Sequence, residues 1–199
     1  MGKSTQARLL QSALAERDIE AVLTREPGGT PGAEAIREML LHPPGEGWGA
    51  EAEALLFAAA RADHVHRLIR PSLDAGKWVI CDRFVDSSRA YQGYAGELGD
   101  EKVRALHEIG SRGLVPDLTI VIGADSEEVG RRLRARDGDA SDAIGGRNEG
   151  YHANVNAAFE AFAEAEPARF ARVDGIGSVD EVRARVMSAV APLIESSGQ

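Results

Sequence analysis

The sequence lacks the features that mark secreted and membrane proteins. Its single cysteine, Cys81, excludes an internal disulfide, which is typical of a protein from a reducing compartment. Cys81 ends an apolar run that begins at Trp78, so we expect a buried and inert thiol. The N-terminus has no apolar signal core, and no later stretch approaches about 18 uninterrupted apolar residues. We therefore expect a cytoplasmic protein without a membrane partner.

Basic side chains are also scarce. The chain has 23 Lys and Arg against 32 Asp and Glu, a formal net charge of −9. A protein that coats a nucleic-acid backbone needs the opposite balance, so we expect no nucleic-acid partner and only local recognition of phosphate. The length of 199 residues and a hydrophobic share of 43% favour one domain over residues 1–199.

Hydrophobic spacing predicts strands that alternate with helices. Short apolar runs of the kind found in buried parallel strands lie at residues 20–24, 78–81, 118–122 and 169–174. Helical spacing occupies residues 4–17, 33–41, 51–74, 101–112, 127–136, 149–165 and 179–194. This order indicates βαβ units, and hence an α/β fold with a parallel sheet that helices cover on both faces.

The predicted helix over residues 51–74 has two distinct faces. The first steps by three and four residues and is expected to be the core stripe: Leu55, Ala58, Ala62, Val65 and Ile69. Phe57, Arg61 and His64 share a second face. An arginine is not buried there without a partner.

Gly2-Lys3-Ser4-Thr5 stands directly before an amphipathic helix, as does the end of the phosphate-binding loop G-x-x-x-x-G-K-[ST]. In such a loop Lys3 would reach the β- and γ-phosphates and Ser4 would offer its hydroxyl to Mg²⁺. Only the second half of the pattern is present. Ser4 or Thr5 as an ordinary helix N-cap is the alternative.

Two further motifs follow predicted strands. Arg25 begins Arg25-Glu26-Pro27-Gly28-Gly29-Thr30 at an edge where open α/β sheets bind ligands, and it could grip a phosphate; a solvated arginine in a surface turn is the alternative. Asp82 and Arg83 close the next strand, where an acidic residue of P-loop enzymes helps to hold Mg²⁺; a structural salt bridge is the alternative. The stretch over 87–93 then offers hydroxyl and amide groups suited to a sugar or a base.

Five arginines of this acidic protein lie near a polar, glycine-rich stretch over 137–150: Arg131, Arg132, Arg134, Arg136 and Arg147. Arginines on a mobile segment suit a lid that closes over ATP, which we place at about residues 134–150. For Arg131 and Arg132 we favour a solvated helix with Glu127 and Glu128 as partners.

These blocks, in this order, resemble the thymidylate kinase family: GKSTQ, TREPGGTPGAEAIRE, AEALLFAAARADH, WVICDRFVDSSRAYQG and PDLTIVI. The resemblance extends from Gly2 to about Val190. It implies an enzyme that transfers the γ-phosphoryl group of ATP, with Mg²⁺, to dTMP to give dTDP, in the supply of dTTP for DNA synthesis. It also implies a P-loop NTPase-like three-layer fold and a homodimer.

The resemblance also assigns roles to residues. Those expected to bind dTMP are Arg25, Phe57, Arg61, Arg83, Ser87, Ser88, Tyr91 and Gln92. Those expected to bind ATP are Gly2, Lys3, Ser4, Thr5 and Arg136. Ser4 and Asp82 would hold Mg²⁺, and the catalytic residues would be Lys3, Arg83, Arg136 and Arg147. Phe57 would stack on thymine, Arg61 would bind its carbonyl, and Tyr91 would screen against a ribose hydroxyl.

The sequence departs from the family pattern in two places. The lid usually reads Asp-Arg-Ile/Phe-Glu, whereas this chain has Ala143 in the arginine position, and we expect Arg147 to replace it. The family also begins with a central strand and the glycines of the loop. Without that strand, backbone N–H and C=O groups of its two neighbouring strands would be unpaired. Each unpaired group costs about 1–3 kcal/mol, against a total stability of about 5–15 kcal/mol. We therefore expect that the first strand is missing, that the start codon was assigned too late and that the natural protein is longer.

Two other functions stay open at this point. One is a kinase for another nucleoside monophosphate or for a deoxynucleoside, against which Phe57, Arg61 and the DRFVDSS block argue. The other is an inactive nucleotide-binding or structural remnant, because half of the phosphate-binding loop is absent.

Overall fold

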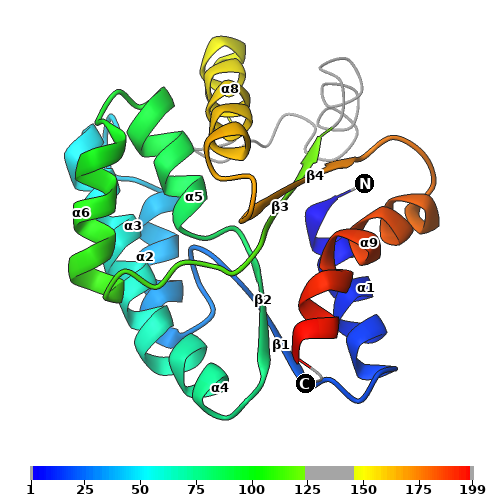
Figure 1. Cartoon of the computed structure of the whole chain (residues 1–199). Helices are drawn as coiled ribbons and strands as arrows, with labels where there is room; N and C mark the ends of the chain where they lie inside the picture. The colour runs from blue at the N-terminus through cyan, green and yellow to red at the C-terminus, as the bar shows by residue number, and fades with distance from the viewer. Residues whose placement is uncertain (1, 124–145, 198–199) are drawn as a thin grey trace.

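Helices flank a set of parallel strands in the computed structural model, which describes residues 2–123 and 146–197 (Figure 1). In chain order the elements are α1 (Lys3–Ala15), β1 (Ala21–Arg25), α2 (Pro31–Leu41), α3 (Ala50–His64), η1 (Val65–Ile69), α4 (Arg70–Asp74), β2 (Trp78–Asp82), α5 (Val85–Ser88), η2 (Arg89–Ala95), α6 (Asp100–Ser111), β3 (Thr119–Gly123), α8 (Glu149–Ala165), β4 (Phe170–Asp174) and α9 (Val179–Ser197). The segments η1 and η2 are π-helical. No helix in these ranges is long and apolar enough to cross a bilayer.

The described strands form two parallel pairs. β1 pairs with β2 from Ala21 opposite Trp78 to Arg25 opposite Asp82. β3 pairs with β4 in the same manner, and the two pairs are separate two-stranded sheets. Helices α2 to α6 lie on one side of β1 and β2, whereas α1 and α9 lie on the other (Figure 1). The predicted α/β class with parallel strands is therefore confirmed.

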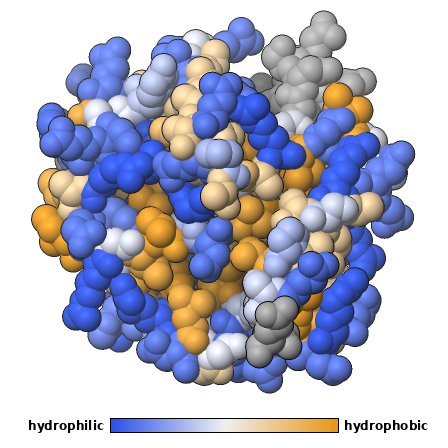
Figure 2. All heavy atoms as spheres, viewed as in Figure 1, coloured by the Kyte–Doolittle hydropathy of each residue, from blue (hydrophilic) through white to orange (hydrophobic). Residues whose placement is uncertain are grey.

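The strands are less buried than their apolar sequences predict. Every residue of β2 is only half-buried, and β1 and β3 are half-buried up to an exposed last residue. Figure 2 shows hydrophobic side chains at the surface in the middle of the view, over the region of β2 and β3 in Figure 1. In a two-stranded sheet each strand has one edge without a neighbouring strand, so side chains near that edge are less shielded.

The main core nevertheless joins both strand pairs. Buried side chains from α1, β4 and α9 form it: Leu10, Leu14, Val173, Val182, Val186 and Val190. Ile80 of β2 and Ile120 of β3 pack against this cluster. A second cluster joins η2, α8 and β4 around Ala90, Phe162 and Phe170. The helices thus hold the two pairs in one α/β body.

The buried face of α3 differs from the one predicted. Leu55 is 55% exposed, so its place in the core stripe was wrong. The buried side chains instead include Phe57 and Arg61, followed in η1 by Val65 and Ile69. These four residues recur every four positions, and the wider turn of η1 suits that spacing. Arg61 takes the core face because it has an acidic partner.

Candidate active site

The ends of β1 and β2 meet at one edge of their sheet. Arg25 and Asp82 are register partners, and α1 begins close by, so that the Ser4 hydroxyl donates to Asp82 Oδ2 at 2.5 Å. The structure thus brings together the two residues predicted to hold Mg²⁺. The described residues contain no group of three or more His, Cys, Asp or Glu that could hold a metal. One carboxylate with one hydroxyl fits Mg²⁺, which takes its other ligands from water and substrate phosphates.

The start of α1 has the form of an anion site. Gly2 is the N-cap, without a side-chain cap, and its carbonyl accepts from the N–H groups of Thr5 and Gln6. The alternative that Ser4 or Thr5 caps the helix is therefore wrong. Lys3 and Ser4 are exposed in the first turn, where the helix dipole and backbone N–H groups favour phosphate.

Arg25 does not stand alone in a surface turn. Its guanidinium donates to both carboxylate oxygens of Glu34, at 3.1 and 3.0 Å, and the Gly29 N–H donates to Glu34 Oε1 at 2.8 Å. The Gly29 hydrogen bond, helped by Arg25, lowers the pKa of Glu34 below its ordinary value. Both side chains remain about half exposed, so the Arg25 guanidinium stays accessible to an anion that replaces Glu34.

Beneath this edge lies a buried network that fixes Arg61. Its Nε donates to Glu26 Oε2 at 2.7 Å, and its terminal nitrogen donates to the Ser88 hydroxyl at 2.8 Å. His64, which is fully buried, bridges Glu26 Oε1 at 3.1 Å and Thr24 Oγ1 at 2.8 Å. The structure therefore joins two residues predicted to bind the base, Arg61 and Ser88, to a buried carboxylate.

Gly29 packs directly against the buried network around Glu26 and His64. Its φ of +90° lies in the left-handed region, which favours glycine. A Cβ atom there would come within 2.5 Å of Thr24 Oγ1 and 2.6 Å of His64 Nε2. The glycine thus allows the loop to approach the network.

Arg83 turns away from the strand that precedes it. Its φ of +71° is unusual for a residue with a side chain, and its guanidinium carbon lies 5.0 Å from the centre of the Tyr91 ring. Among the described residues it forms no ion pair that would occupy its charge.

Cys81, two residues before Arg83, donates to the Arg83 carbonyl at 2.9 Å. Desolvation, together with nearby Glu26, raises the pKa of the Cys81 thiol well above its ordinary value, which favours the protonated form. The side chain is half-buried rather than buried as predicted.

Other charged residues of the DRFVDSSRAYQG block face the interior. Asp86 accepts from both terminal nitrogens of Arg169, at 2.7 and 2.9 Å, from Arg89 at 3.0 Å and from Thr119 at 2.7 Å. Arg89 also binds Asp100 and Glu166. Burial alone would raise the pKa of Asp86, but the hydrogen bonds from Arg169, Thr119 and Arg89 hold it below its ordinary value. We call Asp86, Arg89, Glu166 and Arg169 the Asp86 cluster.

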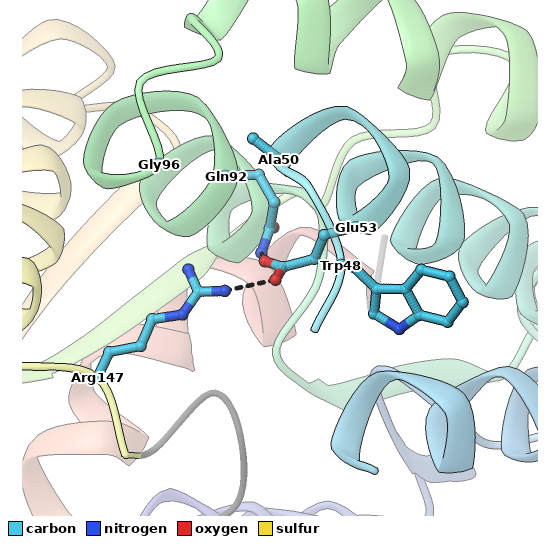
Figure 3. Close-up of a pocket in the computed structure, with 6 residues that line it drawn as sticks. All are labelled: Trp48, Ala50, Glu53, Gln92, Gly96 and Arg147. Atoms are coloured by element: carbon cyan, nitrogen blue, oxygen red, sulfur yellow. Dashed lines mark hydrogen bonds and ion pairs between the residues drawn. The ribbon is translucent and has the colours of Figure 1, made fainter. Parts of the chain in front are cut away.

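Arg147 and Gln92 line a cavity of about 190 Å³ (Figure 3). Arg147 points toward Glu53, with which it forms an ion pair and a hydrogen bond, and it also donates to the Tyr151 hydroxyl. Gln92 Nε2 donates to the other Glu53 oxygen at 2.8 Å. The remaining lining residues are Trp48, Ala50 and Gly96.

The other predicted site residues differ in burial, and some of them lie outside the described part of the chain. Phe57 is buried, and Thr5 lies half-buried in the first turn of α1. Ser87 is half-buried in the short helix that holds Ser88. Arg136 and the other arginines over 131–136 lie outside the described residues, as does most of the predicted lid at 134–150.

Sequence reasoning overlooked four carboxylates of this region: Glu26, Glu34, Glu53 and Asp86. Glu26 and Asp86 lie inside the motifs themselves, and each ends up 5% or less exposed. Glu53 stands four residues before Phe57 and eight before Arg61, so helical spacing placed it on their face. That spacing was the available signal. No sequence signal identified Glu34, because its partners Arg25 and Gly29 reach it only through the fold of the preceding loop.

Comparison with known proteins decides the family. A family model described as thymidylate kinase matches residues 1–186. The chain belongs to the thymidylate kinase family. It is 51% identical to a thymidylate kinase of Rhizorhabdus wittichii over 194 residues, which cover 98% of this chain and 93% of that protein. It is 43% identical to a thymidylate kinase of Nitrobacter winogradskyi over 95% of this chain and 83% of that protein.

A solved structure agrees with this assignment to the thymidylate kinases. The crystal structure of thymidylate kinase from Ehrlichia chaffeensis matches with a TM-score of 0.75 and 30% identity, over 95% of this chain and 92% of that one. The fold is therefore that of a thymidylate kinase. These coverages lend no support to the hypothesis of a late start codon, which stays a prediction.

Proposed function

We propose that this chain transfers the γ-phosphoryl group of ATP to dTMP, giving ADP and dTDP, as expected for a thymidylate kinase. The observation that carries this function is the edge where the Ser4 hydroxyl meets Asp82 and Arg83 lies beside the Tyr91 ring. It combines two oxygen groups suited to Mg²⁺ with a half-buried guanidinium next to an aromatic ring. Family membership over residues 1–186 supports the same reaction. A structural remnant or a kinase for another acceptor is less well supported.

The acceptor side is proposed to bind dTMP through two sets of residues. Phe57, Arg61, Ser87 and Ser88 would contact the base, with Arg61 held in place by Glu26. Arg83 and Arg25 would hold the phosphate, for which Arg25 would leave Glu34. Tyr91 and Gln92 would lie along the sugar. Planar guanidinium groups suit a phosphate because they donate two parallel hydrogen bonds.

The donor side is proposed to lie at the start of α1. Gly2, Lys3, Ser4 and Thr5 would bind the phosphates of ATP, and Ser4 with Asp82 would hold Mg²⁺, which neutralises charge on the transferring group. Arg136 and Arg147 stay predicted as lid residues. Transfer between two bound phosphates needs no covalent intermediate, since positioning and electrostatic stabilisation supply most of the rate.

A homodimer is the proposed assembly, in the cytoplasm. Leu55 of α3 is 55% exposed and Ile109 of α6 is 82% exposed, although α3 and α6 pack against each other. Large apolar side chains on neighbouring helices are common at the core of subunit interfaces.

We also propose that a further strand belongs between β2 and β3. Two features support it: β2 and β3 lie in separate sheets, and neither strand is fully buried despite its apolar sequence. A strand between them would pair with both edges and cover the hydrophobic side chains visible in Figure 2. A crystal structure in which β2 and β3 pair directly would contradict this proposal.

The reaction is tested by acceptor-dependent ADP release. The 199-residue chain and an N-terminally extended form are assayed with ATP, Mg²⁺ and equal concentrations of dTMP, dUMP, dCMP or dGMP. We expect ADP release that depends on dTMP and prefers it over the other acceptors. Release without preference for dTMP would favour another nucleotide kinase. Release from neither form would favour the structural remnant.

A further inference from the structure

A closed ring of side-chain contacts connects α3, η2 and the start of α8. Glu53 Oε1 accepts from Gln92 Nε2 at 2.8 Å, and Glu53 Oε2 pairs with Arg147. Arg147 in turn donates to the Tyr151 hydroxyl, and that hydroxyl donates to the main-chain carbonyl of Tyr91 at 2.6 Å. Because Tyr91 and Gln92 are consecutive, the ring returns to its starting point. We call Glu53, Gln92, Arg147 and Tyr151 the Glu53 ring.

The Glu53 ring holds Tyr91 from two directions. Its carbonyl is fixed by Tyr151, and the next residue is fixed by Glu53. The rings of Tyr91 and Tyr151 also meet edge to face, with centres 6.1 Å apart. The Tyr91 ring also lies against Arg83, whose guanidinium carbon is 5.0 Å from its centre. A displacement of Tyr91 would therefore displace the cation that lies against it.

The side chains of the Glu53 ring are shielded from water well enough for a substitution to have a large effect. The side chain of Glu53 is 12% exposed and that of Arg147 is 25% exposed, and Gln92 is buried. Loss of one partner from a shielded ion pair leaves an uncompensated charge, which costs more than the pair itself contributes. Burial also raises the pKa of Tyr151, so its phenol remains a hydrogen-bond donor at neutral pH.

We propose that Glu53 is a positioning residue for the acceptor nucleotide: it holds Arg147 and Gln92, and through them fixes Tyr91 and Arg83 at the dTMP site. The proposal rests on the dTMP kinase function above. It differs from the expectation that Arg147 replaces the lid arginine. A lid arginine would act on the transferring phosphoryl group, whereas in the Glu53 ring Arg147 acts on the acceptor side.

Glu53→Gln tests this role, because the amide oxygen can still accept from Gln92 while the charge opposite Arg147 is lost. We expect the KM for dTMP to rise about tenfold, the effect of losing one hydrogen bond to a charged group. The KM for ATP should change by less than about threefold, since the contacts described for the Glu53 ring do not include the start of α1. We expect kcat to fall by less than the KM for dTMP rises, because Arg83 keeps its charge. Glu51→Gln, at an exposed position in the first turn of the same helix, is the matched control and should change none of the three.

A double-mutant cycle separates this role from general destabilisation. Glu53→Gln and Arg147→Gln remove the two halves of one interaction, so their combined effect on the KM for dTMP should be close to that of either alone. Tyr151→Phe, which removes only a hydroxyl, should raise the same KM. Tyr151→Phe also carries the test if Glu53→Gln does not fold.

Three results would overturn the proposal. They are an unchanged KM for dTMP in Glu53→Gln, equal changes for both substrates, or a large loss of kcat in Arg147→Gln with an unchanged KM for dTMP. dTMP binding to each variant is also measured by calorimetry, which requires no turnover. An unmodified chain that binds dTMP without releasing ADP would contradict the proposed reaction but leave the role of Glu53 measurable.

Discussion

Two charged regions of this molecule use their charges differently. In the Asp86 cluster every carboxylate and guanidinium has partners within the chain, and Asp86 itself is 3% exposed. At the edge formed by Ser4, Arg25, Asp82 and Arg83 the partners are fewer, and Ser4 and Arg25 are exposed while Asp82 and Arg83 are half-buried. Charges that the chain satisfies internally stabilise the fold, whereas accessible charges can bind a ligand, for which we propose a nucleotide.

Substitution in the Asp86 cluster should have the largest effect on stability. Asp86→Ala leaves Arg169 and Arg89 without their buried partner, and we expect the free energy of unfolding to fall by about 3–5 kcal/mol. Denaturant unfolding measures this change. Asp180→Ala, at an exposed position in the first turn of α9, is the control and should change stability by less than about 0.5 kcal/mol. Similar losses in the two variants would contradict a special role of the Asp86 cluster in stability.

Arg83→Ala should have the largest effect on activity. If Arg83 holds the acceptor phosphate, its loss should lower kcat/KM for dTMP by about 10²–10³-fold, the usual cost of one stabilising donor. The unfolding midpoint should hardly change, because Arg83 has no ion pair among the described residues. Steady-state kinetics and thermal unfolding measure both quantities, with the exposed Arg8→Ala as control. A variant that loses stability but keeps its kcat/KM would assign Arg83 to the fold instead.

Lowering the pH should destabilise the folded state through the Asp86 cluster, with a smaller effect than the substitutions above. Hydrogen bonds from arginines, opposed by burial, lower the pKa values of Asp86 and Glu166 in the folded state. A depressed pKa contributes stability above the unfolded pKa of about 4, and that contribution is lost as the pH falls through the folded pKa. Each unit of depression corresponds to about 1.4 kcal/mol. Unfolding measured from pH 7 to pH 3 should show this loss, and Asp86→Asn should show less of it.

The sequence predicted the elements of this molecule better than the contacts between them. Apolar spacing located the described strands and the long helices to within a few residues, because periodicity is a local property. The core face of α3 was wrong at Leu55, since the choice between two faces depends on Glu26, 35 residues before Arg61 in the chain. The π-helical segments η1 and η2 were not predicted, because a spacing of four residues fits an α-helix as well as a wider turn.

The candidate site was predictable to the extent that its motifs are contiguous. Asp82, Arg83 and Ser4 were found from short patterns, and the structure brings Ser4 to Asp82. Glu53 was overlooked although helical spacing placed it on the face of Phe57 and Arg61. Glu34 was not found because its partners depend on the fold of the preceding loop. Asp86 was inside a recognised block, but only the fold separates it, as an interior residue, from Arg83.

Denaturant unfolding with and without saturating dTMP tests the division between the two regions most directly. A ligand at about 100 times its Kd adds about 2.7 kcal/mol to the stability of a protein that binds it only when folded. We expect Arg83→Ala to keep the stability of the unliganded chain and lose most of this increment. Asp86→Asn should lose stability without ligand and keep the increment. The reverse pattern, with Arg83→Ala retaining the full increment or folded Asp86→Asn losing it, would contradict the account.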